Sequence, residues 1–143
     1  MKYLLDTCLL SEAFKKKPNQ HVMDWLASRD EQSLYLSVLT LGEIEKGISK
    51  SQDPVQQKKL RNWLELDLKD RFRYRILPVD LKVALKWGTI QAKAEQVGAS
   101  IPAIDGLIAA TGLLHNCIVV TRNIEDMRQS QVELFNPWDE PCF

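Results

Sequence analysis

Three acidic residues stand out because of the apolar segments that surround them. Asp105 is the only charged residue between Ile101 and Leu114, and a helix that is apolar on nearly every side is a buried helix. A buried carboxylate is costly unless a cation or hydrogen-bond donors meet it. Asp6 directly follows a short apolar run, and Glu43 follows a second one. Three carboxylates without basic residues beside them in the sequence indicate a metal site.

The electrostatics of such a cluster favour a hard divalent ion. Two carboxylates about 4 Å apart repel each other by roughly 4 kcal/mol at an effective dielectric constant near 20. A cluster of three therefore needs a cation to offset this repulsion. Because the ligands are hard oxygens, we expect Mg²⁺, with Mn²⁺ as a possible substitute.

Each acid also has a purely structural explanation. Asp6 could cap the helix that follows it, and Asp105 could interact with the positive end of its own helix. Thr40 and Glu43 have the spacing of a capping box. These explanations stay open for each residue singly. The three together favour the metal site, because Ser, Thr or Asn would serve as caps equally well.

The elements that must position these acids alternate between strands and helices. Such alternation predicts an α/β protein with three layers (α/β/α), in which a mainly parallel sheet of four to five strands is covered on both faces. The predicted strands are 2–5, 34–38, 75–79, 117–120 and 132–135. The predicted helices are 6–14, 20–28, 40–50, 54–71, 80–97 and 101–114.

This architecture predicts that the acids converge. In an open parallel sheet, ligands bind beyond the carboxyl ends of the strands. Asp6 ends the first strand, Thr121 follows the fourth, and Glu43 lies one turn into the helix after the second. Asp105 lies near the start of the helix that feeds the fourth strand, so we expect it at the same edge.

Length and composition exclude several classes of protein. The 143 residues fit one domain, 1–143, and no apolar run is long enough to span a membrane. The three cysteines form no close pair, which is typical of reduced thiols in a cytoplasmic protein. Nineteen basic and nineteen acidic residues cancel, so a nucleic acid would have to be held by a local patch.

Four segments, in order, resemble the sequence blocks of the PIN-domain ribonucleases and, more narrowly, of the VapC/FitB toxins of bacterial toxin–antitoxin pairs. The similarity extends over essentially the whole chain, and the ending 134–138 is similar too. The four segments are Asp6-Thr-Cys-Leu-Leu-Ser-Glu12, Glu43-Ile-Glu-Lys-Gly47, Pro102-Ala-Ile-Asp-Gly-Leu-Ile-Ala-Ala110 and Val119-Val-Thr-Arg-Asn123.

The resemblance implies a metal-dependent endoribonuclease that often cuts structured RNA such as tRNA. Asp6, Glu43 and Asp105 would form the acidic triad that binds Mg²⁺ or Mn²⁺, and Thr121 would orient a water or a carboxylate or, alternatively, cap a helix. Many members carry a fourth acid where this chain has Asn123, which supplies only a neutral oxygen. Asp126 lies three residues further on and could reach the metal through a water, so a second metal ion stays open. The resemblance also implies a small antitoxin whose tail lies in a hydrophobic groove, and a homodimer.

RNA binding would need cations beside the acids. Arg122 follows Thr121 directly, and Lys46 and Lys50 lie on the face of the helix that carries Glu43, so these three are the candidate substrate contacts.

Two other functions remain to be tested. The first is a catalytically weak PIN-like module that binds RNA or a protein partner, which the asparagine at position 123 makes conceivable. The second is a receiver-like phosphorylation switch with Asp80 at the end of its third strand.

Overall fold

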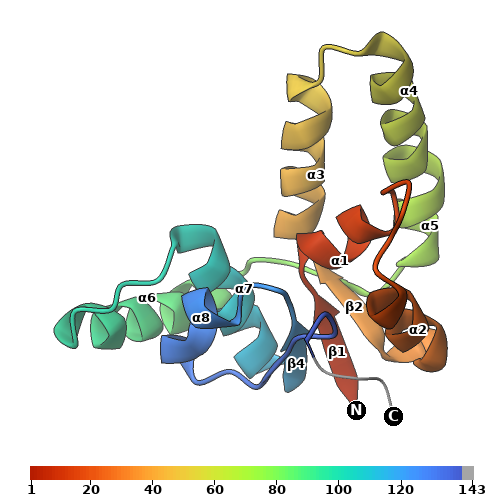
Figure 1. Cartoon of the computed structure of the whole chain (residues 1–143). Coiled ribbons are helices and arrows are strands. Elements are labelled where there is room, and N and C mark those ends of the chain that lie inside the picture. Colours follow the sequence, from red (N-terminus) through yellow and green to blue (C-terminus); the bar gives the residue numbers. More distant parts are fainter. Residues whose placement is uncertain (140–143) are drawn as a thin grey trace.

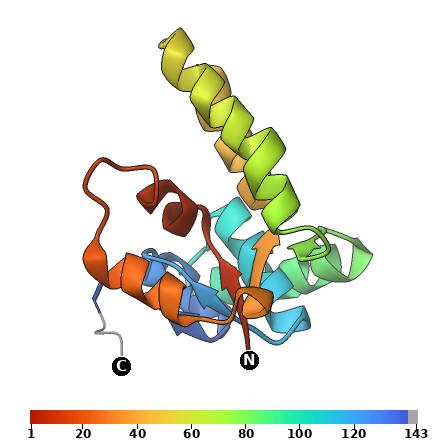
Figure 2. The ribbon, with the colours of Figure 1, turned by 90° about the vertical axis from the view of Figure 1, so that its right-hand side faces the viewer.

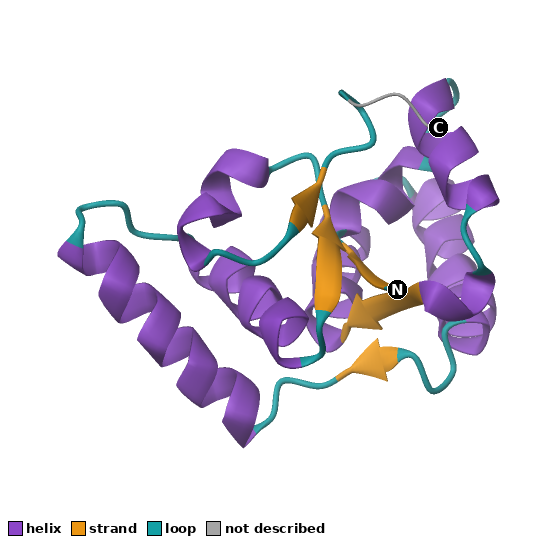
Figure 3. Ribbon diagram, turned by 90° about the horizontal axis from the view of Figure 1, so that it is seen from below, coloured by secondary structure: helices purple, strands orange, loops and turns teal. Residues whose placement is uncertain are grey.

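The computed structural model describes residues 1–139 and has a five-stranded sheet at its centre (Figure 3). The strand order is β3-β2-β1-β4-β5, and every neighbouring pair is parallel. The strands are β1 (Lys2–Leu5), β2 (Leu34–Ser37), β3 (Ile76–Leu77), β4 (Cys117–Val120) and β5 (Leu134–Phe135). The predicted parallel sheet is confirmed, with the outer strands β3 and β5 shorter than expected.

The central strand β1 supplies apolar side chains to both faces of the sheet. Leu4 packs on one face, and its register partner Val119 belongs to the same cluster. Leu5 and its partner Val120 pack on the opposite face. Strands that are buried on both faces are continuously apolar rather than alternating, which explains the run Tyr3–Leu5.

Helices cover both faces, as the sequence predicts for a three-layer fold. One cluster of buried side chains joins the sheet to the helices that follow β1 and β2, and a second joins it to the helices that directly precede and follow β4. A third packs the two long helices before β4 against each other. The first set contains α1 (Thr7–Glu12), α2 (Gln20–Ser28), the short η1 (Glu31–Ser33) and α3 (Val38–Lys50). The second contains α6 (Leu81–Gln96), α7 (Ala103–Leu114), α8 (Ile124–Met127) and the short η3 (Arg128–Ser130).

An arm made of α3 and a second long helical segment projects from the body (Figures 1 and 2). The second segment consists of α4 (Pro54–Asn62), the π-helical η2 (Trp63–Leu68) and α5 (Lys69–Arg71). It begins at Pro54 because Asp53 accepts hydrogen bonds from the backbone N–H groups of Val55 and Gln56. The helix predicted over 54–71 is confirmed, but its π-helical part was not predicted.

The packing of α6 on α7 depends on a glycine beside one of the candidate acids. A Cβ at Gly106 would lie 2.8 Å from Nε2 of Gln91 and 3.0 Å from Cδ1 of Trp87. A side chain at this position would therefore require Gln91 and Trp87 to shift, so the glycine favours the close approach of α7 to α6. This contact sets the position of Asp105, the preceding residue on α7.

The predictions about the cysteines and about membrane-spanning segments can be checked against this fold. Cys8 and Cys117 are free thiols, and Cys142 lies outside the described residues. Within residues 1–139, no helix has the length and apolar character needed to cross a bilayer.

Candidate active site

Asp6 lies at the carboxyl end of β1 with both carboxylate oxygens engaged. Its Oδ1 accepts a hydrogen bond from the backbone N–H of Thr7 at 2.9 Å, so the residue does cap α1. Its Oδ2 accepts from Oγ1 of Thr121 at 2.7 Å and from the thiol of Cys8 at 3.8 Å. The side chain is only 4% exposed. Capping thus uses one oxygen and leaves the other facing the end of β4.

Thr121 follows β4 and is completely buried. Besides donating to Asp6, its hydroxyl accepts a hydrogen bond from the backbone N–H of Asn123 at 3.0 Å. The residue therefore orients a carboxylate. The alternative explanation, in which Thr121 is the N-cap of the next helix, is wrong because Asn123 occupies that position of α8.

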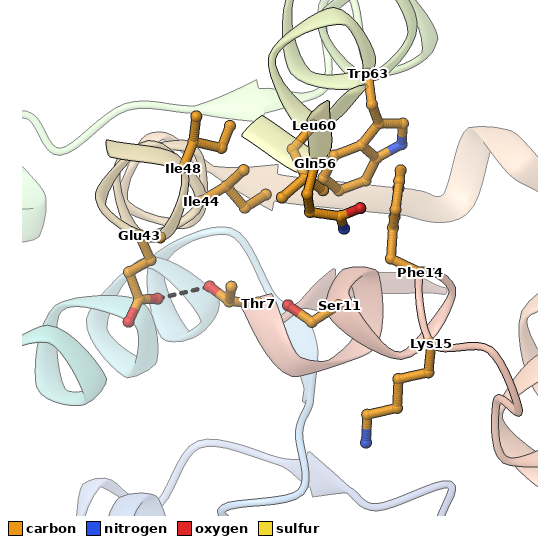
Figure 4. A pocket seen from close by; sticks show the side chains of 11 residues that line it. Thr7, Ser11, Phe14, Lys15, Glu43, Ile44, Ile48, Gln56, Leu60 and Trp63 are labelled. Carbon is orange, nitrogen blue, oxygen red and sulfur yellow. Dashed lines mark hydrogen bonds between the residues drawn. The ribbon is translucent and has the colours of Figure 1, made fainter. Parts of the chain in front are cut away.

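Glu43 reaches the same edge of the sheet from α3. Its Oε1 accepts a hydrogen bond from Oγ1 of Thr7 at 2.6 Å, which ties α3 to α1 (Figure 4). The capping-box explanation of Thr40 and Glu43 is wrong. Because β2 ends at Ser37, the helix starts at Val38 with Ser37 as its cap, and Thr40 is a buried residue of the first turn.

Asp105 lies in the first turn of α7 and is half-buried. Burial, followed by the negative charges of Asp6, Asp126 and Glu43, raises its pKa to about 6. Four carboxylates from different elements are therefore within electrostatic reach of one another. None of the four forms an ion pair with a basic residue in the part of the chain that the structure describes.

The donor chemistry of this acidic rim (Asp6, Glu43, Asp105 and Asp126) fits a hard divalent cation, because such an ion would offset the repulsion that raises the pKa of Asp105. Over residues 1–139, however, no group of three His, Cys, Asp or Glu side chains is arranged to hold a metal ion. Glu43 is turned toward Thr7 instead. Metal binding through the rim would therefore require its side chains to turn toward a common centre.

The other predicted site residues are exposed, and Lys50 lies at the far end of α3, in the projecting arm. Asn123 is exposed, and together with Arg122 and Asp126 it lines a hollow of about 350 Å³. Lys46 and Lys50 are exposed on α3, and neither forms an ion pair within the described residues. Asp80 is not a rim residue: it caps α6 after the edge strand β3, so the receiver-like interpretation is wrong.

Sequence reasoning missed one buried acid on α1. Glu12 is 3% exposed, and its carboxylate accepts hydrogen bonds from the backbone N–H of Asn19 at 2.8 Å and from Nε1 of Trp138 at 3.3 Å. Burial raises the pKa of Glu12, but these hydrogen bonds and the ammonium group of Lys15 lower it below the ordinary value. One signal was available, since Glu12 shares a helix face with the buried Leu9.

A mainly apolar groove opens beside the rim, between α1 and the arm (Figure 4). Its volume is about 320 Å³, and Thr7 and Glu43 are among its lining residues. The rings of Phe14 and Trp63 meet edge to face with centroids 4.2 Å apart at its wall. Its other lining residues are Ser11, Lys15, Ile44, Gly47, Ile48, Gln56 and Leu60.

Comparisons with known proteins agree on one family. The model of the PIN domain family matches residues 3–131. The toxin FitB of Neisseria gonorrhoeae is 36% identical over 137 residues, which cover 96% of this chain and 99% of that protein. The VapC ribonuclease Y4jK of Sinorhizobium fredii is 30% identical over 136 residues, which cover 95% and 97%. The crystal structure of FitAcB from Neisseria gonorrhoeae superposes with a TM-score of 0.93 at 36% identity, covering 96% of this chain and 99% of that one.

Proposed function

We propose that this chain, which belongs to the PIN-domain family, is the ribonuclease toxin of a toxin–antitoxin pair and hydrolyses RNA phosphodiester bonds. The resemblance drawn from the four sequence segments is confirmed by the family match, and two relatives carry the names toxin and ribonuclease. The observation that carries the proposal is the acidic rim, whose four carboxylates have no basic partner among the described residues.

Asp6, Glu43 and Asp105 would hold the metal ion, with Mg²⁺ as the expected ion and Mn²⁺ as a substitute. A bound divalent ion lowers the pKa of its water and offsets charge on the phosphoryl oxygens. Thr121 keeps Asp6 in place through the hydrogen bond at 2.7 Å. A carboxylate of the rim would orient or deprotonate the attacking water.

Asp126 is the candidate for the fourth acidic position, in place of Asn123. Both residues line the hollow beside the rim, but Asn123 offers only a neutral oxygen. The charge of Asp126 contributes to the raised pKa of Asp105, which supports this role. We therefore assign to Asp126 the role that an acid at position 123 would have, and to Asn123 the role of a neutral contact for water or substrate.

RNA cleavage with Mg²⁺ or Mn²⁺, compared between the wild type and Asp6→Asn, tests the enzymatic function. The variant removes one charge from the rim but keeps the shape of the side chain, so we expect the rate to fall at least about a hundredfold, or about 2.7 kcal/mol. Asp67→Asn is the matched control, because Asp67 is exposed on η2 and far from the rim in sequence. Equal rates in the wild type and Asp6→Asn would overturn the proposal.

Asn123 also supports a second candidate, a catalytically weak module that binds RNA or a protein partner. In that case the wild type would bind RNA or its partner with no metal-dependent cleavage. Asn123→Asp separates the weak module from the active nuclease. If the missing charge at position 123 limits the rate, the variant should cleave RNA faster than the wild type. If Asp126 already serves as the fourth acid, the rate should change little.

The groove between α1 and the arm is the proposed site for an apolar segment of the antitoxin. Its walls carry Ile44, Ile48 and Leu60, and Glu43 links it to the acidic rim, so a bound segment would also obstruct the rim. Leu60→Glu should abolish the complex with the protein encoded by the adjacent reading frame while RNA cleavage persists. Retention of the complex would place the antitoxin elsewhere.

We also propose a cytoplasmic homodimer, with the exposed face of α6 as its interface. Leu81 and Leu85 are 73% and 65% exposed and lie one helical turn apart. Sedimentation of the wild type should give a dimer, and Leu85→Glu should give a monomer. A dimer that survives this substitution would exclude α6.

A further inference from the structure

We infer that Trp138 is a positioning residue that holds Arg122 beside the acidic rim, where the guanidinium binds a phosphate of the RNA backbone. The inference rests on the proposed RNA-cleaving function. It gives a role to the segment that follows β5, to which the proposed RNA cleavage alone assigns none.

Arg122 is an exposed cation at the carboxyl end of β4. It forms no ion pair within residues 1–139, whereas Arg128, which lines the same hollow, pairs with Glu125. The guanidinium of Arg122 lies over the ring of Trp138, 5.4 Å from its centroid. Stacking uses the flat face of a guanidinium and leaves its N–H donors, which lie in the plane, free for the oxygens of an anion.

Trp138 is itself held by contacts from two sides. Its Nε1 donates to Oε1 of the buried Glu12 at 3.3 Å, and its backbone N–H donates to Oδ1 of Asn136 at 2.9 Å. The other oxygen of Glu12 is held by the backbone N–H of Asn19. A buried carboxylate with this many partners gives the indole a fixed anchor on α1.

The pairing of β5 with β4 brings the tryptophan to the arginine. Val120 is in register with Phe135, and the backbone N–H of Thr121 donates to the carbonyl of Phe135 at 2.9 Å. The residues that follow these two strands therefore leave the sheet side by side. On the other side, the backbone N–H of Arg122 donates to the thiol of Cys8, two residues from Asp6.

The location of Arg122 favours a phosphate as its ligand. The hollow that it lines also contains Asn123 and Asp126, so the cation stands at the border of the acidic rim. A polyanion approaching this rim meets repulsion from four carboxylates, and a cation at the border offsets part of it. RNA presents such phosphates at regular spacing, so one phosphate can reach Arg122 while its neighbour enters the rim.

The test compares Trp138→Leu, which removes the aromatic face, with Trp138→Phe, which keeps a face but loses the N–H donor. On a defined RNA, we expect Arg122→Ala to raise KM about tenfold and Trp138→Leu to raise it about fivefold, with kcat changed less than twofold. Trp138→Phe should lie between the wild type and Trp138→Leu. The double variant should be no worse than Arg122→Ala, because the tryptophan acts through the arginine.

RNA binding to the same variants in an Asp6→Asn background provides a readout that a purely structural role would not change. Both Arg122→Ala and Trp138→Leu should reduce the dependence of log Kd on log salt by about 0.7, the value for one lost phosphate contact on a single strand. Arg29→Ala is the matched control, since Arg29 also lies over a tryptophan, Trp25, but beside Tyr3 at the start of β1. It should leave the salt dependence unchanged.

The outcomes separate this inference from the function on which it rests. If the wild type cleaves RNA and Trp138→Leu and Trp138→Phe keep its KM and salt dependence, the inference is wrong and the function stands. If the wild type cleaves no RNA, the function fails, and the binding measurement still decides the role of Trp138. Loss of antitoxin binding at unchanged RNA affinity would assign Arg122 to the protein partner and would also overturn the inference.

Discussion

Two groups of charged residues lie at opposite ends of the sheet and differ in how the negative charge of their carboxylates is balanced. At the amino ends of β2 and β3, Glu31 accepts hydrogen bonds from Arg71 at 2.8 Å and from Arg75 at 2.9 Å. Burial raises the pKa of Glu31, but the two guanidinium groups outweigh it and lower the pKa below its ordinary value. At the carboxyl ends, no carboxylate of the acidic rim forms an ion pair among residues 1–139, and the pKa of Asp105 is raised to about 6.

The difference shows which group serves the fold and which serves a ligand. Arg75 also donates to the backbone carbonyls of Glu31, Leu34 and Arg71, so this cluster fastens β2, β3 and α5 together. The acidic rim makes fewer such connections between elements, and its negative charges remain available to a cation from outside the chain. A group of unneutralised acids lowers the stability of the metal-free protein, and this cost is typical of binding sites.

The largest effect on folding is expected from Arg75→Met. The side chain of Arg75 is 8% exposed, and its removal leaves several backbone carbonyls without their donor, while Arg71 still pairs with Glu31. Leaving buried acceptors without their donor costs about 1–3 kcal/mol each, so we expect a loss of about 3 kcal/mol of unfolding free energy. Urea unfolding measures it, with Arg73→Met as the control, because the pair of Arg73 with Asp70 is exposed and is worth less than about 1 kcal/mol. Equal losses in both variants would remove the distinction between the two kinds of ion pair.

Metal ions should stabilise the protein through the rim alone. At a Mn²⁺ concentration about a hundred times the dissociation constant, binding to the folded state adds about 2.7 kcal/mol to the unfolding free energy. Asp105→Asn should lose most of this gain, while Glu31→Gln should keep it. Thermal unfolding with and without Mn²⁺ measures the gain. An equal gain in all three proteins would place the ion outside the rim.

Without metal, Asp105→Asn should stabilise the protein. The neutral amide avoids the cost of burying a charge and removes the repulsion from Asp6, Asp126 and Glu43, the two effects that raise the pKa of Asp105. Allowing for solvent screening at this half-buried site, we expect a gain of about 1 kcal/mol at pH 7. Urea unfolding in the presence of a chelator measures the gain. A loss of stability would mean that the carboxylate has a structural role.

The smallest expected effect is a change in the acid limb of the stability curve. Because the folded-state pKa of Glu31 is lowered, its contribution is fully present above the unfolded value, about 4.3, and is lost as the pH falls through the lower folded value. Glu31→Gln should therefore be less stable than the wild type at pH 7, and the difference should shrink toward pH 3. Unfolding free energies measured from pH 7 to pH 3 give the difference directly, and a difference that does not change with pH would exclude this role of Glu31.

Part of the site could be predicted because it depends on where strands end. Asp6 and Thr121 directly follow β1 and β4, so a parallel pairing was enough to place them together. The bond between Thr7 and Glu43 and the anchoring of Trp138 by Glu12 could not be predicted in this way. The first joins residues 36 positions apart and the second joins residues 126 positions apart, and no local pattern marks either pair.

The sequence alone determined the type and order of the five strands and the long helices, because side-chain periodicity and helix-breaking residues act over a few neighbouring positions. It did not predict the short η1, α8 and η3 or the π-helical η2. It also determined which acids belong to strand ends or helix starts. Only the tertiary structure decided that β1 lies between β2 and β4, that Asp126 joins the rim and that Arg122 stacks on Trp138. These features depend on strand order and on the packing of distant segments, which local patterns do not encode.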